Sequence, residues 1–245
     1  MAVEPSVTRI ADLQVFYGLM DRLIETQGGP MSLANVTTSS VSPLGVYFFF
    51  EPGEHRSESG DGQRVVRVGT HGLKSGAAST LHGRLRQHRG KGDGGGNHRG
   101  SIFRLLTGDA LMRCDEAAPC GTWGSSGVAA RASNRTLAMK ESEGVLERAV
   151  SKRLASMQVA CLAIGDEPGP DSQRGWIERN AIALLSNSGK PDLDAPSPEW
   201  LGHHSSRTRV RSSGLWNQNH VDEAYAPSFL ADLERWVADQ GRAKG

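Results

Sequence analysis

Two polar side chains occur where the sequence is otherwise apolar. Tyr47 lies within "GVYFFF", residues 45–50, although the chain has only three tyrosines. Glu178 is the only acid in segment 173–187. A phenol can take part in proton transfer, and a lone carboxylate can bind one divalent cation that keeps most of its waters. The alternative for Glu178 is a solvent-facing glutamate beside Arg179.

Arg84 and His88 are four residues apart in the basic segment "TLHGRLRQHRG", residues 80–90, which has the pattern of a short helix. Residues at this spacing share one face of a helix, so both side chains can reach the same small target. An arginine neutralises phosphate charge as it develops, and a histidine holds or moves a proton near neutral pH. Such a pair is also common on protein surfaces, so its chemistry depends on whether Tyr47 and Glu178 join it.

Positive charge is concentrated around this helix. The chain has a formal net charge of +1, yet residues 82–113 contain six arginines and one lysine against two aspartates. Arginine forks bind phosphates in a bidentate manner, and the glycines of "KGDGGGNHRG" let backbone amides approach closely. The stretch therefore predicts contact with a DNA backbone, although a solvated basic helix face is the alternative. The residues expected to make the contact are Arg86, Arg89, Lys91 and Arg99.

The elements that must position these residues follow from periodicity and from glycine and proline stops. The fold class we predict is α+β, with a small central antiparallel sheet of about three strands flanked by helices and with helical extensions at both ends. The expected strands are residues 42–54, 63–71 and 157–165, the first two forming a hairpin with a long loop. The expected helices are residues 8–26, 80–90, 101–112, 137–156, 176–187 and 226–240. The tail 190–225 contains Trp200 and Trp216, which favours an ordered wrap over disorder.

Composition is that of an ordinary globular protein, with 37% hydrophobic and 22% charged residues among 245. No apolar run reaches the roughly 18 residues of a membrane span, so we expect a cytoplasmic protein with no membrane partner. Three cysteines are too few for a disulfide framework. Cys114, Cys120 and His98 match no standard zinc spacing and lack a fourth ligand, so free thiols are the prediction.

The order of these elements resembles that of the GIY-YIG endonuclease family. "GVY" corresponds to the first half of the family's name motif and "RVG", residues 67–69, to the second. "RLRQH" matches the family's basic helix, and "WIERNAIALLSN", residues 176–187, is similar to the helix that carries the metal-binding glutamate. The resemblance covers about residues 44–190, with a large atypical stretch inside it.

The resemblance implies a role for each of the four residues. Tyr47 would position or deprotonate the attacking water, with help from the cation because a phenol is weakly acidic. Arg84 would stabilise the pentavalent phosphorane, and His88 would assist by a hydrogen bond or proton transfer. Glu178 would hold a single Mg²⁺ or Mn²⁺ ion.

Two further positions follow from the family, and one departs from it. His71 falls near a position where relatives place a polar or basic residue, and Asn187 is the nearest candidate for a downstream asparagine. The second tyrosine of the name motif is replaced by Arg67 or its neighbour Val66. Some of the chemistry is therefore redistributed or lost.

The resemblance implies a divalent-metal-dependent DNA endonuclease. The sequence leaves open whether the protein is a monomer or a homodimer. The alternatives are a catalytically impaired nucleic-acid-binding protein of the same fold and an unrelated α+β protein with a basic loop. We expect one elaborated domain, residues 1–245, with the nuclease core at 44–190 and an insertion at about 105–157. Residues 1–43 and 191–245 would be the N-terminal and C-terminal extensions.

Overall fold

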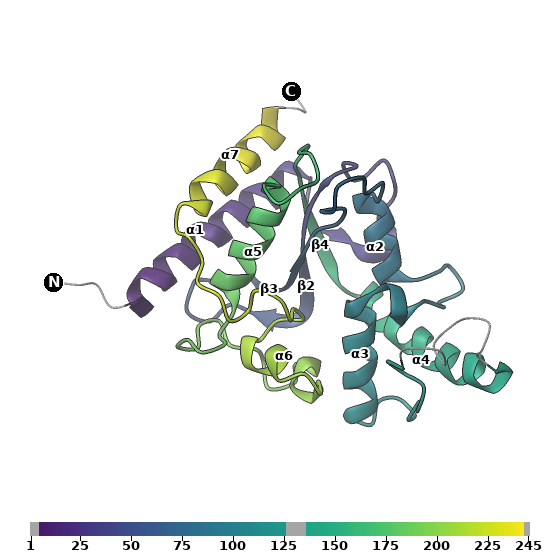
Figure 1. Cartoon of the computed structure of the whole chain (residues 1–245). Helices are drawn as coiled ribbons and strands as arrows, with labels where there is room; N and C mark the ends of the chain where they lie inside the picture. Colours follow the sequence, from purple (N-terminus) through teal and green to yellow (C-terminus); the bar gives the residue numbers. More distant parts are fainter. Residues whose placement is uncertain (1–4, 126–135, 243–245) are drawn as a thin grey trace.

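A computed structural model of the chain describes residues 5–125 and 136–242. A four-stranded antiparallel sheet in the order β1-β4-β2-β3 lies between two groups of helices (Figure 1). The α+β prediction is confirmed, and its three strands are β2 (Gly45–His55), β3 (Gln63–Gly69) and β4 (Gln158–Ala163). The two-residue strand β1 (Met31–Ser32) adds a fourth at the edge beyond β4.

Strand β2 is central and is buried on both faces. It pairs with β3 on one side and β4 on the other, so its side chains alternate between the two groups of helices. Val46, Phe48 and Phe50 point to one face, whereas Tyr47 and Phe49 point to the other. This double burial explains the run of apolar residues, because neither face of the strand meets solvent over residues 45–51.

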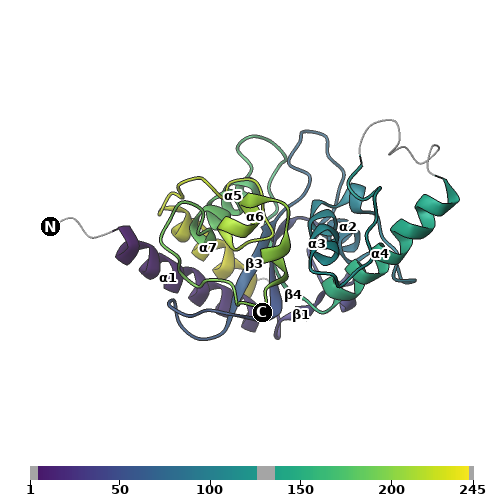
Figure 2. The same ribbon diagram turned by 90° about the horizontal axis from the view of Figure 1, so that it is seen from below.

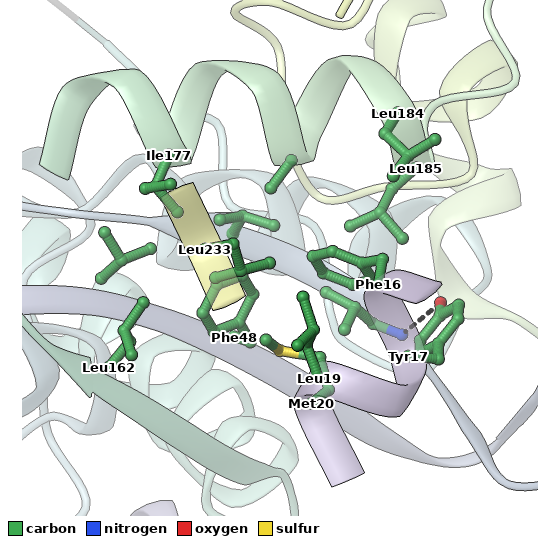
Figure 3. Packing of buried hydrophobic residues seen from close by; sticks show 14 of the residues in the cluster. Phe16, Tyr17, Leu19, Met20, Phe48, Leu162, Ile177, Leu184, Leu185 and Leu233 are labelled. Carbon is green, nitrogen blue, oxygen red and sulfur yellow. Dashed lines mark hydrogen bonds between the residues drawn. The ribbon is translucent and has the colours of Figure 1, made fainter. Parts of the chain in front are cut away.

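The first face of the sheet is covered by α1 (Pro5–Thr26), α5 (Gln173–Leu185) and α7 (Phe229–Arg242), as Figures 1 and 2 show. Its core consists of interlocking apolar side chains, with the Phe16 and Phe48 rings edge to face at 5.9 Å (Figure 3). The Tyr17 hydroxyl accepts a hydrogen bond from the Val65 amide at 3.1 Å. The apolar face of the central strand thus anchors all three helices.

The second face is covered by α2 (Leu81–Arg89), α3 (Ile102–Arg113) and α4 (Leu137–Ala155), which lie on the other side of the sheet in both views (Figures 1 and 2). Thr80 caps α2, because its hydroxyl accepts a hydrogen bond from the Gly83 amide at 3.1 Å. The expected insertion at 105–157 holds most of α3 and all of α4, and its residues 126–135 lie outside the described residues.

The C-terminal tail is ordered, as its two tryptophans predicted. The 3₁₀ helix η5 (Leu201–His204) and helix α6 (Thr208–Ser213) lie within this tail. Two other 3₁₀ helices, η1 (Leu33–Asn35) and η2 (His98–Gly100), lie earlier in the chain. The Trp200 and Trp216 indoles are buried and donate hydrogen bonds to Glu51 at 3.2 and 3.1 Å. Across residues 5–125 and 136–242, every helix is too short or too polar to cross a bilayer.

Candidate active site

Tyr47 lies at the start of the central strand, and its ring crosses the neighbouring strand at Gly69. The two residues are direct partners in the β2–β3 ladder. A methyl group added at Gly69 would overlap the Tyr47 hydroxyl and ring. Glycine at this place in "RVG" therefore lets the phenol lie flat against the strand and project beyond it.

The Tyr47 hydroxyl is hydrogen-bonded to a buried histidine. Its oxygen lies 2.9 Å from Nε2 of His88, and Nδ1 of His88 lies 2.8 Å from Oγ of Ser101. Burial lowers the pKa of His88 well below its ordinary value, and the nearby positive charges of Arg67, Arg84 and Arg104 lower it further. The imidazole is therefore neutral, with one nitrogen able to donate a hydrogen bond and the other able to accept one.

Arg84 lies one helical turn before His88 on α2. Its Nη1 donates hydrogen bonds to Oε1 of Gln87 at 2.9 Å and to the carbonyl of Gly100 at 3.1 Å. These contacts hold the partly exposed guanidinium at the border of a cavity that Tyr47 also lines.

Glu178 reaches the same cavity from α5, on the other side of the sheet. Its Oε1 accepts a hydrogen bond from the Thr70 amide at 3.2 Å, and the Thr70 hydroxyl donates to the Gly45 carbonyl at 2.8 Å. Burial raises the pKa of the Glu178 carboxyl, while the positive charges of Arg67 and His220 oppose that rise. A carboxylate in this position gains from a cation placed beside it.

The cavity has a volume of about 190 Å³ and lies where β2 begins and β3 ends. Tyr47, Arg67, Thr70, Arg84 and Glu178 line it, together with the segment 216–220. Three of the predicted residues, Tyr47, Arg84 and Glu178, therefore line the same cavity. A fourth, His88, does not line it but is hydrogen-bonded to the Tyr47 hydroxyl. They come from β2, α2 and α5, which are far apart in the sequence.

The segment 216–220 is a part of the site that sequence reasoning missed. The Trp216 amide donates to the Val66 carbonyl at 2.8 Å. The side-chain amide of Asn217 accepts a hydrogen bond from the Val68 amide at 3.1 Å and donates one to the Val68 carbonyl at 2.8 Å. The segment is therefore fixed along the free edge of β3. Its tryptophan signalled order, but no spacing in the sequence connects it to β3.

Two residues suggested by the family resemblance lie outside the cavity lining. His71 is buried, with Nδ1 3.0 Å from the Ser79 carbonyl and Nε2 without a hydrogen-bond partner. Burial and the charge of Arg174 lower its pKa. Asn187 binds Arg9, which donates to Oδ1 at 2.8 Å, so this asparagine ties α1 to the end of α5. The catalytic roles of His71 and Asn187 remain predictions.

The predicted DNA-binding residues divide into two groups. Arg86, Arg89 and Lys91 line a hollow of about 550 Å³ beside α2, together with several glycines of the following loop. Arg99 does not line this hollow. Its guanidinium instead forms an ion pair with Glu143 at 2.7 Å, and that hydrogen bond raises the pKa of Arg99.

The described residues offer few protein ligands for a metal ion at any one place. Within residues 5–125 and 136–242, three or more His, Cys, Asp or Glu side chains do not gather anywhere in a way that would hold a metal ion. Cys114, Cys120 and His98 are not among such a group, and the described cysteines are free thiols. A cation at Glu178 would therefore take most of its ligands from water and substrate, as Mg²⁺ often does.

Comparison with known families identifies the chain. The sequence matches the GIY-YIG domain over residues 7–243. Because this match covers nearly the whole chain, the protein belongs to the GIY-YIG domain family. Membership indicates a nuclease-type function in general and implies nucleic-acid binding. Neither a curated protein nor a solved structure matches the chain.

Proposed function

We propose that this protein is a divalent-metal-dependent DNA endonuclease that hydrolyses phosphodiester bonds with a water positioned by Tyr47. One observation carries the proposal. A phenol, a guanidinium and a carboxylate from three separate elements line one cavity, and a neutral histidine is hydrogen-bonded to the phenol. These are the groups that phosphodiester hydrolysis needs for proton transfer, charge stabilisation and metal binding.

The hydrogen bond between Tyr47 and His88 supplies a path for the proton of the attacking water. When the Tyr47 hydroxyl donates to Nε2, the Nδ1–H of His88 donates to Ser101. As the water oxygen bonds to phosphorus, the water proton moves to the Tyr47 oxygen and the tyrosine proton moves to Nε2. The bond between phosphorus and the 3′ oxygen then breaks, and the leaving oxygen takes a proton from solvent. The extra proton on His88 returns to solvent through the Tyr47 hydroxyl, which restores the neutral imidazole. Arg84 binds the negative charge that develops on the phosphoryl oxygens.

Glu178 has the donor chemistry of a ligand for one Mg²⁺ or Mn²⁺ ion. Its Oε1 accepts the Thr70 hydrogen bond, whereas Oε2 receives no donor from the described residues. Burial raises the pKa of the carboxyl although nearby positive charge opposes the rise, and a divalent cation beside Oε2 would stabilise the carboxylate further. A bound cation would neutralise the scissile phosphate and the leaving 3′ oxygen.

The hollow beside α2 is the surface that we assign to the DNA backbone. Arg86 and Lys91 are exposed there, and Arg84 joins α2 to the loop by its hydrogen bond to Gly100. Arginine and lysine side chains at such a surface release counterions from DNA, so affinity falls as the salt concentration rises. Replacement of Arg86 or Lys91 by alanine should reduce the slope of this salt dependence by about one unit each.

The proposal is tested by incubating the protein with supercoiled plasmid and Mg²⁺ or Mn²⁺. Wild-type protein should nick or linearise the plasmid, whereas Glu178→Gln should be slower by a hundredfold or more, about the loss of one charge-stabilising group. Glu167→Gln is the matched control, because Glu167 is an exposed glutamate in the loop before α5. Equal rates for wild type and Glu178→Gln would exclude the metal site.

One departure favours a second candidate function. Arg67 stands where the name motif has its second tyrosine, so a nucleic-acid-binding protein of the same fold without turnover is the alternative. Wild-type protein that binds duplex DNA in a gel-shift experiment, but leaves it intact with either metal, would establish this second function and refute the first.

A further inference from the structure

Arg67 differs from three of the other buried arginines in how its charge is compensated. Its side chain is only 5% exposed, and none of the described carboxylates forms an ion pair with it. By contrast, Arg64, Arg104 and Arg174 each pair with a carboxylate, namely Glu54, Glu147 and Asp166. A buried guanidinium without a counter-ion costs free energy unless an anion joins it.

The hydrogen bonds of Arg67 are also incomplete. Its Nη1 donates to the Trp216 carbonyl, and its carbon Cζ lies 4.9 Å from the centre of the Phe103 ring. Its Nε is buried and has no hydrogen-bond partner. Arg9, which likewise lacks a paired carboxylate, donates from all of its side-chain nitrogens to oxygen acceptors. The Tyr47 side chain and the charge of Glu178 stabilise the Arg67 guanidinium in part, but its Nε remains a donor that the described residues do not use.

Strand register directs Arg67 toward the cavity. Arg67 pairs with Phe49 in the β2–β3 ladder, and residues that are directly paired point to the same face of a sheet. Phe49 lies two positions from Tyr47 on β2, so Arg67 and Tyr47 share that face. Both side chains line the cavity.

The cavity therefore carries two guanidinium groups, those of Arg67 and Arg84, against the single carboxylate of Glu178. We propose that Arg67 is a catalytic residue that binds a non-bridging oxygen of the scissile phosphate, opposite Arg84. This inference rests on the proposed endonuclease function and assigns the residue that replaces the second tyrosine of the motif. The phosphate then gives Arg67 the direct ion pair that Glu178, which acts on it from beyond ion-pairing distance, does not provide, and substrate binding relieves the remaining cost of the buried charge.

Arg67→Gln and Arg64→Gln form a matched pair that tests this inference. Both arginines lie on β3 and are buried, but Arg64 is ion-paired with Glu54 and does not line the cavity. Arg67→Gln should slow single-turnover cleavage by a hundredfold or more and keep a melting temperature close to that of wild type. Arg64→Gln should lower the melting temperature and leave the cleavage rate of the folded protein within threefold. Arg67→Lys, which keeps the charge and loses the fork, should fall between wild type and Arg67→Gln in rate.

A second measurement is independent of turnover. Inorganic phosphate should raise the melting temperature of wild type and Arg64→Gln above its value in potassium chloride of the same ionic strength, and it should not do so for Arg67→Gln. A phosphate effect that persists in Arg67→Gln, or a cleavage rate within threefold of wild type, would show that Arg67 only anchors the Trp216 carbonyl. If wild type does not cleave DNA but phosphate stabilises it through Arg67, the endonuclease proposal fails and the phosphate site stands.

Discussion

The two faces of the sheet are built from the same strand but differ in their chemistry. Val46, Phe48 and Phe50 pack into an apolar core with α1, α5 and α7 (Figure 3). Tyr47 and Phe49, which alternate with them, face α2 and α3 and meet a buried polar network. The first face therefore supplies most of the apolar core, and the second holds Tyr47, Arg84 and His88; Glu178 joins them from α5 on the first face.

The polar network on the second face fixes the backbone of His88. Arg104 donates to the His88 carbonyl at 2.9 Å and forms an ion pair with Glu147 at 2.5 Å. The Phe49 ring lies edge to face with Tyr47 at 5.5 Å and with His88 at 5.9 Å. Aromatic packing and buried ion pairs thus fix the geometry of the Tyr47–His88 hydrogen bond, whereas the first face needs only close packing.

The largest expected difference between the two faces is in the effect of removing one tyrosine hydroxyl from each. Tyr47→Phe should slow cleavage by about 10²- to 10⁴-fold, the usual contribution of a group that transfers a proton. Tyr17→Phe is the matched variant, because the Tyr17 hydroxyl on the first face also makes one buried hydrogen bond, to the Val65 amide. It should cost about 1 kcal/mol of stability and leave the rate unchanged. Single-turnover cleavage and urea unfolding measure both effects, and equal rates for the two variants would contradict this division.

Adjacent phenylalanines on β2 allow the same comparison for packing. Phe48→Ala and Phe49→Ala should each lower the free energy of unfolding by about 3–5 kcal/mol, since both side chains are fully buried. Only Phe49→Ala should also slow cleavage by folded protein, because only Phe49 contacts Tyr47 and His88. Urea unfolding and cleavage assays at low temperature separate these effects. A matching loss of rate in Phe48→Ala would show that general loosening, and not the position of the rings, controls activity.

Gly69 tests how closely the tyrosine must be placed. Gly69→Ala adds a methyl group where the Tyr47 hydroxyl lies, so the phenol must move. A displacement of about 1 Å is expected to lower the cleavage rate by about a hundredfold. Gly18→Ala on α1 is the control, because a methyl group there meets open space. An unchanged cleavage rate in Gly69→Ala would mean that the position of Tyr47 does not limit the reaction.

Local patterns in the sequence predicted three of the four strands and singled out the three residues that line the cavity, whereas the resemblance to the GIY-YIG family related those residues to one another. The alternation around Tyr47 and the four-residue spacing of Arg84 and His88 are properties of a strand and a helix, and the structure has both. Glu178 was distinctive because it is an acid in an apolar helix. These features depend on neighbouring residues, so they can be predicted without the tertiary fold.

The remaining parts of the site depend on contacts between distant segments. The direction of Arg67 follows from its pairing with Phe49 in the β2–β3 ladder, a register that no hydrophobic pattern in the sequence reveals. The position of segment 216–220 depends on its hydrogen bonds to the edge of β3, about 150 residues earlier in the chain. His71 lies off the cavity lining because its imidazole turns toward the Ser79 carbonyl. The positions of these residues are determined by strand register and by the paths of the loops in the folded protein.

The smallest predicted effect concerns pH and again distinguishes the second face. The pKa of His88 in the folded protein lies well below its ordinary value of about 6.5, so below pH 6.5 the unfolded chain binds a proton that the folded protein does not. Stability should therefore fall as the pH decreases, by about 1.4 kcal/mol for His88 between pH 7.5 and 5.5. His88→Gln should remove this part of the slope, while carboxylates that titrate in both proteins cancel in the difference. The lowered pKa of His71 acts in the same direction, so His71→Gln gives a separate, second difference. Urea unfolding at pH 7.5, 6.5 and 5.5 provides the measurement, and parallel curves for wild type and His88→Gln would show that His88 becomes protonated without unfolding.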